Sequence, residues 1–301
     1  MFMKKEIIET IISKTVKQKI KNIRSIVGKG DVNKIFVVEL ENRKVLLRIN
    51  SKWDGLMEFK KEVWCIEKSK KKGVPCSNIL GVGMYKDYSY MIYDFIQGRS
   101  GGEIKNKKEV WVTIGRYAKL INSVKVKGYG LRFSPEDNRF TESWSRHIRY
   151  NIESLNEEDK LLDLKIYDKD QLIMIKKYFF DLKKNKFKIG LIHNDLSLRN
   201  VVVNDVGDVF LIDWGCAEAN FVPLGEFVEI LGAGHMDLKI PTSEEIDCFL
   251  KGYGISKKEF EILKKDISKF LLLVSFDKLR WAIDKSLGDV KEMSKIARKR
   301  L

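Results

Sequence analysis

The feature that most constrains this chain is a set of polar residues at fixed spacing in its second half. His193 and Asp195 follow an apolar run, and Asn200 comes five residues after Asp195. Asp213 lies thirteen residues after Asn200, and the segment 201–212 between them consists of two β-rich runs joined by a polar turn that contains glycine. Such a segment is typical of a β-hairpin, which would return Asp213 to the side of Asn200.

Carboxylate and amide oxygens at this spacing indicate phosphoryl transfer from a nucleotide. Transfer of a γ-phosphoryl group depends on positioning and on cations that neutralise developing charge. We expect Asp195 to accept the proton of the acceptor hydroxyl, and Asn200 and Asp213 to hold Mg²⁺. His193 is expected to brace the loop rather than to transfer protons. The alternative is that these are ordinary turn residues around a buried hairpin. A single motif would not exclude that alternative.

Residues 190–215 resemble the protein-kinase-like superfold and, within it, the aminoglycoside phosphotransferase and choline kinase-like family, where His-Asn-Asp or His-Gly-Asp and Ile-Asp-Trp are common. Asn194 stands where protein kinases carry an arginine, and no Ala-Pro-Glu follows Asp213. These departures disfavour a protein substrate. The resemblance implies an α+β, protein-kinase-like two-lobed fold. Its N-lobe would be a small antiparallel β-sheet with one helix, and its C-lobe would be larger and mainly helical.

The N-terminal third contains the parts of a nucleotide-binding lobe. Gly28, Gly30 and Asn33 form a G-x-G-x-x-N pattern before a strand-like run, and the glycines would let backbone amides approach phosphate oxygens closely. The run 44–49 predicts a second strand, so that the two runs form a hairpin with the glycine loop at one edge. Arg48 falls where the resemblance places the basic residue that pairs with the phosphates.

The partner of Arg48 is expected to be a carboxylate on the following helix. Apolar residues recur there at helical spacing from Leu56 to Ile66, and Glu62 lies next to this stripe. Glu58, one turn earlier, is the second candidate. The alternative is a solvated surface pair on an ordinary amphipathic helix.

The aromatic strand 88–98 resembles the hinge between the two lobes of the family. Backbone groups of Tyr93 and Phe95 are expected to pair with the purine edge, and because backbone recognition leaves almost no side-chain signature, ATP and GTP are not separated. Gly98 favours a lobe boundary at this point. We therefore expect a nucleotide-binding N-lobe over residues 1–97 and a catalytic and acceptor-binding C-lobe over residues 98–301.

Composition agrees with a folded enzyme and sets limits on its partners. The chain has 301 residues, of which 44% are hydrophobic, and this favours a compact, ordered protein. Its net charge of +15 is spread over the chain without a recognisable nucleic-acid module, so no nucleic acid is expected. Four scattered cysteines without C-x-x-C spacing make zinc improbable. Without a secretory signal or a long apolar run, we expect a cytoplasmic monomer that does not bind membranes.

Acidic residues near the expected acceptor face are the candidates for binding the acceptor. An aminoglycoside is a polycation, so its site should be lined by carboxylates, and a tryptophan could add a cation–π surface. The candidates are Glu218, Glu226, Glu229 and Trp144, together with Glu142 and Glu153. For each of them, the alternative is an ordinary surface acid or a core tryptophan.

The sequence therefore predicts an Mg²⁺-dependent small-molecule O-phosphotransferase that moves the γ-phosphoryl group of ATP or GTP to an acceptor hydroxyl. An aminoglycoside-type antibiotic is the first candidate acceptor, which would make the enzyme a resistance factor. Choline, ethanolamine, a sugar or a macrolide is the alternative within the enzyme class. A nucleotide-binding pseudoenzyme is the alternative outside it, and the intact Asp195, Asn200 and Asp213 argue against that reading.

Overall fold

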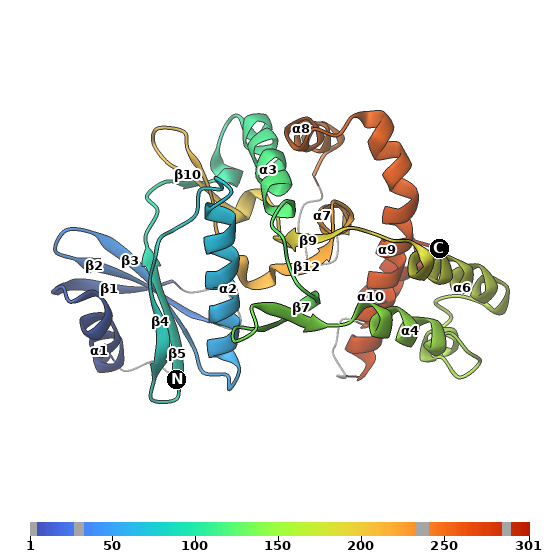
Figure 1. The fold of residues 1–301 in the computed structure, drawn as a ribbon, viewed down its shortest axis with the longest axis horizontal. Coiled ribbons are helices and arrows are strands. Elements are labelled where there is room, and N and C mark those ends of the chain that lie inside the picture. The colour runs from blue at the N-terminus through green and yellow to red at the C-terminus, as the bar shows by residue number, and fades with distance from the viewer. Residues whose placement is uncertain (1–4, 27–32, 233–240, 285–289) are drawn as a thin grey trace. The chain divides into compact units, whose positions relative to one another are not determined.

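The computed structural model describes residues 5–26, 33–232, 241–284 and 290–301 (Figure 1). The chain forms two compact units, and each is assembled from stretches that are separate in sequence. The first contains Met1–Val110, Phe133–Arg139 and Ser197–Ala217, and the second contains Trp111–Arg132, Phe140–Leu196 and Glu218–Leu301. The α+β fold class is confirmed, with an antiparallel sheet in the N-terminal region and mainly helices in the C-terminal region. The functional division after residue 97 stays a prediction.

The first unit is built on an antiparallel sheet with the strand order β1-β2-β3-β5-β4 (Figure 1). The strands are β1 (Ile20–Ile26), β2 (Lys34–Leu40), β3 (Lys44–Asn50), β4 (Ile79–Tyr85) and β5 (Tyr88–Asp94). In β3, Val45, Leu47 and Ile49 alternate onto one face and join the buried core with residues of the neighbouring strands. Because side chains alternate across a strand, Arg48 points to the opposite face.

Two helices accompany this sheet, one more than the sequence predicted. α1 (Lys5–Val16) buries Ile8, Ile11 and Ile12 in the same core as the alternating residues of β3. α2 (Gly55–Lys70) is the expected helix and contacts β4 and β5. Glu62 is buried on α2, which places a carboxylate on the side of the sheet that α1 leaves free.

The first unit also contains the predicted hairpin. β10 (Val201–Val203) pairs with β11 (Val209–Leu211) and with β6 (Arg99–Ser100), and the 3-10 turns are η1 (Gly101–Glu103), η2 (Leu198–Asn200) and η3 (Trp214–Cys216). Gly98 allows the close approach of these segments, since a Cβ atom there would lie 2.4 Å from the carbonyl oxygen of Val203. A side chain at this position would therefore force the two segments apart.

The second unit holds most of the helices and a four-stranded sheet. Its sheet order is β8-β7-β12-β9, with β7 (Tyr129–Ser134), β8 (Arg139–Glu142), β9 (Ile189–Ile192) and β12 (Glu218–Phe221). The helices are α3 (Lys107–Asn122), α4 (Trp144–Ser154), α5 (Lys160–Asp163), α6 (Lys169–Lys184), α7 (Leu224–Gly232), α8 (Ser243–Tyr253), α9 (Lys257–Asp284) and α10 (Val290–Arg298). Within the described ranges, no helix is long and apolar enough to cross a membrane.

Candidate active site

The hairpin brings together the two residues predicted to hold a metal. Val201 pairs with Leu211, and the backbone N–H of Ile212 donates to the carbonyl oxygen of Asn200 at 3.0 Å. Asn200 and Asp213 therefore flank the open end of the hairpin. Asp213 has φ 60° and ψ 71°, a left-handed conformation that aspartate tolerates better than most residues, and it turns the chain into η3.

Arg48 and Glu62 form a buried ion pair in the first unit. Arg48 Nη1 lies 2.5 Å from Glu62 Oε2, and the two residues are 7% and 2% exposed. Burial opposes the charge on Arg48, but Glu62 holds its pKa above the ordinary value; burial raises the pKa of Glu62, and Arg48 opposes that change. Glu58 instead accepts a hydrogen bond from Asn50 at 3.2 Å. The pairing favoured from the sequence is thus the one observed.

This ion pair belongs to the same electrostatic cluster as Asp213. The Asp213 carboxylate contributes to the raised pKa values of both Arg48 and Glu62. Next to it, Lys61 Nζ donates to the carbonyl oxygen of Gly215 at 2.8 Å, a buried contact that the sequence did not indicate. A Cβ atom on Gly215 would lie 3.6 Å from Glu62 and 3.7 Å from Asp213. The Arg48 guanidinium, which suits a phosphate, and the Asp213 carboxylate, which suits a metal, therefore lie near each other.

The donor set of the hairpin fits Mg²⁺. This ion prefers oxygen ligands and is usually held by one or two carboxylates together with substrate phosphates and water. Asn200 and Asp213 supply one amide and one carboxylate oxygen on neighbouring backbone segments. Within the described residues, no group of three or more His, Cys, Asp or Glu side chains could hold a metal by itself. Asn200 and Asp213 therefore suit a Mg²⁺ site whose remaining ligands are nucleotide phosphates and water.

The glycine loop is only partly described. Gly28 and Gly30 lie outside the described residues, so their predicted contact with phosphates stays a prediction. Asn33, which closes the motif, is half-buried, and its Oδ1 atom is buried without a hydrogen-bond partner among the residues that the structure describes.

The predicted hinge residues Tyr93 and Phe95 lie at the end of β5, and their pairing with a purine stays a prediction. Tyr93 lies inside the sheet, in register between Leu46 of β3 and Ile79 of β4, so strand pairing engages its peptide groups. The N–H of Phe95 donates to the carbonyl oxygen of Lys44 at 3.1 Å. The Tyr93 side chain reaches the ion-pair cluster instead, where burial raises its pKa to about 12 and the positive charge of Arg48 opposes this rise.

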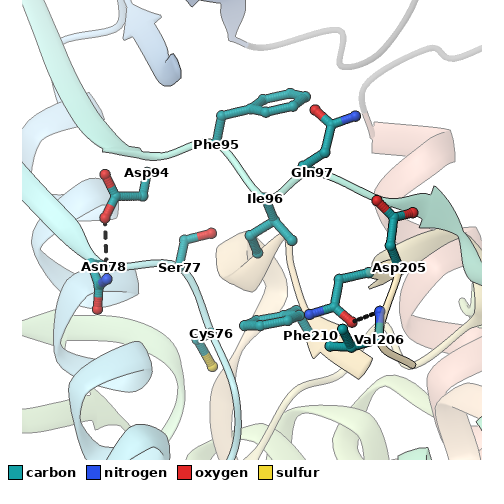
Figure 2. A pocket seen from close by; sticks show the side chains of 11 residues that line it. Cys76, Ser77, Asn78, Asp94, Phe95, Ile96, Gln97, Asp205, Val206 and Phe210 are labelled. Atoms are coloured by element: carbon teal, nitrogen blue, oxygen red, sulfur yellow. Dashed lines mark hydrogen bonds between the residues drawn. The ribbon is translucent and has the colours of Figure 1, made fainter. Parts of the chain in front are cut away.

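A cavity of about 450 Å³ lies beside the segment that follows β5 (Figure 2). Figure 2 shows the Ile96 side chain pointing into it above Phe210, and Asn78 donates to Asp94 at 3.1 Å. The residues lining the cavity are Cys76, Ser77, Asn78, Asp94, Phe95, Ile96, Gln97, Asn204, Asp205, Val206 and Phe210. Two of these are acids and none is basic, so this cavity is unsuited to the phosphates of a nucleotide.

In the second unit, the loop that carries the predicted base starts where β9 ends. His193 is fully buried, and its N–H donates to Glu226 Oε1 at 2.8 Å. Asn194 has φ 59° and donates its N–H to Glu226 Oε2 at 3.4 Å. Asn and Gly are the residues that adopt this left-handed conformation most easily, which gives a physical reason for Asn194 between His193 and Asp195. Asp195 itself is half-buried.

Glu226 was predicted to line the acceptor face, and the structure corrects this. Its side chain is fully buried in α7, where it braces the loop of the predicted base. Asn122 also donates to Glu226, at 3.4 Å, and accepts from the hydroxyl of Tyr253 at 2.8 Å. Burial raises the pKa of Glu226 to about 7, against the hydrogen bonds that it accepts. The signal in the sequence is an acid inside the apolar helix LGEFVEILG, which must find buried partners.

The other acceptor candidates have different environments. Glu218 begins β12 opposite Ile192, the residue before His193, and is half-buried. Trp144 packs against other rings, with Phe221 edge-on at 4.8 Å. Glu142 accepts from the backbone N–H of Leu131 at 3.3 Å, Glu153 is exposed on α4, and Glu229 is half-buried beside Glu226. Their roles in acceptor binding stay predictions.

Comparison with known proteins places this arrangement in a family. The sequence profile described as the phosphotransferase enzyme family matches residues 24–222, well over half of the chain. A curated relative, the RIO-type serine/threonine-protein kinase Rio2 of Methanocaldococcus jannaschii, is 33% identical over 85 residues. That match covers 28% of this chain and 32% of the relative, so the chain spans about a third of the length of this curated relative.

Solved structures share the fold over nearly the whole chain. A thermostable mutant of aminoglycoside phosphotransferase APH(4)-Ia, in a ternary complex with AMP-PNP and hygromycin B, is similar with a TM-score of 0.69 and 15% identity over 97% of each chain. A Haemophilus somnus protein described as a fructosamine-3-kinase is similar with a TM-score of 0.63 and 13% identity, over 98% of this chain and 96% of that chain. At these identities the likeness shows the fold alone, and it confirms the predicted kinase-like fold.

Proposed function

From the premise that this chain belongs to the phosphotransferase enzyme family, we propose that it transfers the γ-phosphoryl group of ATP or GTP to a hydroxyl of a small molecule. The observation that carries this proposal is the buried Arg48–Glu62 ion pair in one electrostatic cluster with Asp213. Burying an arginine is costly, and the binding of phosphates is a reason to retain one at this place.

Each residue then has a defined task. Arg48 pairs with the phosphates, and Glu62 fixes the guanidinium in place. Asn200 and Asp213 would hold Mg²⁺, and the ion when bound would supply positive charge beside the transferred group. Asp195 accepts the proton of the acceptor hydroxyl as its oxygen attacks, while His193 and Asn194 are fixed through Glu226. The glycine loop from Gly28 would cover the phosphates. Similar proteins bound to AMP-PNP support the nucleotide as co-substrate.

Replacement of Asp195 tests the assignment of the base. Asp195→Ala and Asp195→Asn should each lower kcat by about 10²–10⁴-fold, the usual contribution of a general base, with little change in nucleotide affinity. Glu158→Gln, an exposed change between α4 and α5, serves as the control and should leave turnover unchanged. Turnover close to that of wild type in Asp195→Ala would overturn the assignment.

Replacement of Asp213 tests the metal site. Asp213→Ala should abolish the increase in nucleotide affinity that Mg²⁺ produces, because it removes the carboxylate of the proposed donor set. Titration calorimetry with AMP-PNP, with and without Mg²⁺, measures this directly. Equal responses to Mg²⁺ in wild type and variant would contradict the proposed site.

The acceptor is proposed to be an aminoglycoside-type antibiotic, since aminoglycoside phosphotransferases share the fold. A nucleotide-turnover screen over aminoglycosides, fructosamines, choline, ethanolamine, macrolides and sugars tests this choice. A protein hydroxyl is a second candidate, favoured by the match to a serine/threonine-protein kinase, and a generic protein substrate belongs in the same screen. Turnover with none of these acceptors, and no hydrolysis of nucleotide, would favour the pseudoenzyme.

A further inference from the structure

One face of α6 combines lysines with exposed apolar side chains. α6 packs against α4 and α9, and its buried residues are Ile175, Phe179 and Leu182 (Figure 1). The residues that helical spacing places on the opposite face are Lys169, Ile173, Lys177, Phe180 and Lys184. Ile173 is 75% exposed and Phe180 is 42% exposed, so both present large apolar surfaces to solvent.

Positive charge is concentrated on this helix and on the connection that follows it. Residues 169–188 contain seven lysines and two aspartates, so that +5 of the chain's net charge of +15 lies in twenty residues. One of the two acids, Asp181, already pairs with Lys269 of α9, whose Nζ lies 2.9 Å from Oδ2 of the aspartate. Beyond the end of α6, Lys186 and Lys188 are exposed. The basic surface therefore continues from α6 to the start of β9.

The exposed face of α6 has the composition of a helix that lies on a membrane surface. Such helices carry lysines on a polar face and large apolar side chains that enter the boundary between headgroups and acyl chains. In α6 the apolar residues Ile173 and Phe180 are two turns apart on the face that also carries the lysines. Anionic headgroups would attract these lysines, and the boundary beneath the headgroups would accommodate the two apolar side chains.

The chemistry of the same residues disfavours a nucleic acid. All the basic residues in the range 169–188 are lysines, and the range contains no arginine. Arginine supplies the planar fork that pairs with phosphates and with guanine, whereas lysine acts as a point charge that suits a diffuse layer of headgroups. Ile173 would gain nothing beside phosphates, because its side chain can neither donate a hydrogen bond nor stack on a base.

We propose that the exposed face of α6, together with the lysines that follow it up to Lys188, binds the surface of membranes that contain anionic lipids. The lysines contact the headgroups, and Ile173 and Phe180 enter the boundary beneath them. The expectation that the protein does not bind membranes rests on the lack of a long apolar run, which a helix on a membrane surface does not need. This surface is independent of the proposed phosphoryl transfer, so that either proposal can fail alone.

Sedimentation of the full chain with lipid vesicles tests the charge contribution. Wild type should bind vesicles of equimolar phosphatidylcholine and phosphatidylglycerol, and it should bind vesicles of phosphatidylcholine alone far less. Each lysine near an anionic surface contributes about fivefold to binding, so the double change Lys183→Gln and Lys184→Gln should weaken binding by about 25-fold. The double change Lys71→Gln and Lys72→Gln removes the same charge from two exposed positions after α2, and this matched control should bind nearly as wild type does.

A second pair of variants tests the apolar contribution. Ile173→Ser should weaken binding to the anionic vesicles by about three- to tenfold, because it removes apolar area that the membrane would bury. Val206, in the turn between β10 and β11, is also β-branched and is 83% exposed, so Val206→Ser is the control and should leave vesicle binding unchanged. All the substituted positions are exposed, and thermal unfolding shows whether each variant is folded.

Three results would overturn the proposal. They are equal binding to the two kinds of vesicle, unchanged binding by the double variant at Lys183 and Lys184, and equal effects of Ile173→Ser and Val206→Ser. Titration of the protein into a labelled RNA duplex gives the nucleic-acid outcome. Tight binding to the duplex without binding to either kind of vesicle would assign this surface to a nucleic acid and would also overturn the proposal.

Discussion

Glu226 offers the most informative perturbation of the loop that carries the predicted base. It is a fully buried carboxylate that accepts hydrogen bonds from the N–H groups of His193 and Asn194. The change Glu226→Gln keeps the size of the side chain but replaces one acceptor oxygen by an NH₂ group. In the place of Oε2 that group cannot accept from the N–H of Asn194, and in the place of Oε1 it cannot accept from His193 or Asn122.

The expected changes in the free energy of unfolding follow from the burial of Glu226 and from its pKa. A buried donor left without an acceptor costs about 1–3 kcal/mol, so Glu226→Gln should be less stable than wild type by about this amount at low pH. The folded pKa of Glu226 is about 7, against an ordinary value of 4.5. At about 1.4 kcal/mol for each pH unit, the native state favours the protonated acid by about 3 kcal/mol.

The sign of the pH dependence follows from which state binds the proton. Between about pH 4.5 and 7 the unfolded chain has lost the Glu226 proton while the native state keeps it, so wild-type stability falls as the pH rises. The contribution is fully present below the unfolded pKa and is lost once the pH passes the folded pKa. Gln does not titrate, so the stability gap between wild type and Glu226→Gln should shrink by about 3 kcal/mol over this range.

Urea unfolding at a series of pH values measures the gap, and the other titrating groups cancel because both proteins share them. Glu153→Gln, an exposed change on α4, is measured in the same series as the reference for a surface substitution. A gap between wild type and Glu226→Gln that stays constant or widens from about pH 4.5 to 7 would refute the reasoning. As a second readout, the variant should lose turnover but not nucleotide affinity, since the Arg48 cluster does not include Glu226.

Three further changes test other parts of the site. Glu62→Gln leaves the buried charge of Arg48 without its partner and should destabilise the protein by about 3–5 kcal/mol in urea unfolding, whereas Glu58→Gln should have a small effect. Asn194→Val places a β-branched residue at φ 59° and should cost about 1–2 kcal/mol with loss of turnover, whereas Asn194→Gly should stay active; equal activity of the two would contradict the backbone argument. Gly98→Ala brings a methyl group to 2.4 Å from a carbonyl oxygen and should lower stability by about 1–3 kcal/mol, measurable as a fall in Tm.

Short-range patterns were sufficient to predict one half of the site. Two β-rich runs around a glycine turn predict a hairpin, and a hairpin places Asn200 near Asp213, as the structure has it. Alternation in β3 and helical spacing in α2 likewise place Arg48 and Glu62 on facing surfaces. In both cases the period of the backbone fixes the direction of each side chain, so the sequence alone carries the information.

Such short-range patterns do not predict contacts between segments that are distant in sequence. Glu226 was assigned to the acceptor surface because a polycationic acceptor needs carboxylates, and only the packing of α7 under the loop of His193 shows that it is buried with backbone partners. The hinge depends on such contacts too, since pairing on both sides of β5 decides which of its peptide groups are engaged within the sheet.

The sequence by itself thus determined the family, the fold class and the residues that strand or helix periodicity places on one face. Only the tertiary structure decided which partner each buried polar group has: Glu226 for the loop of the predicted base, and Asp277 for His147 across 130 residues. The physical reason is that a buried polar group must find a partner, but the requirement can be met by any complementary group that the fold brings near. Local periodicity gives the direction in which a side chain points, and packing decides what it meets.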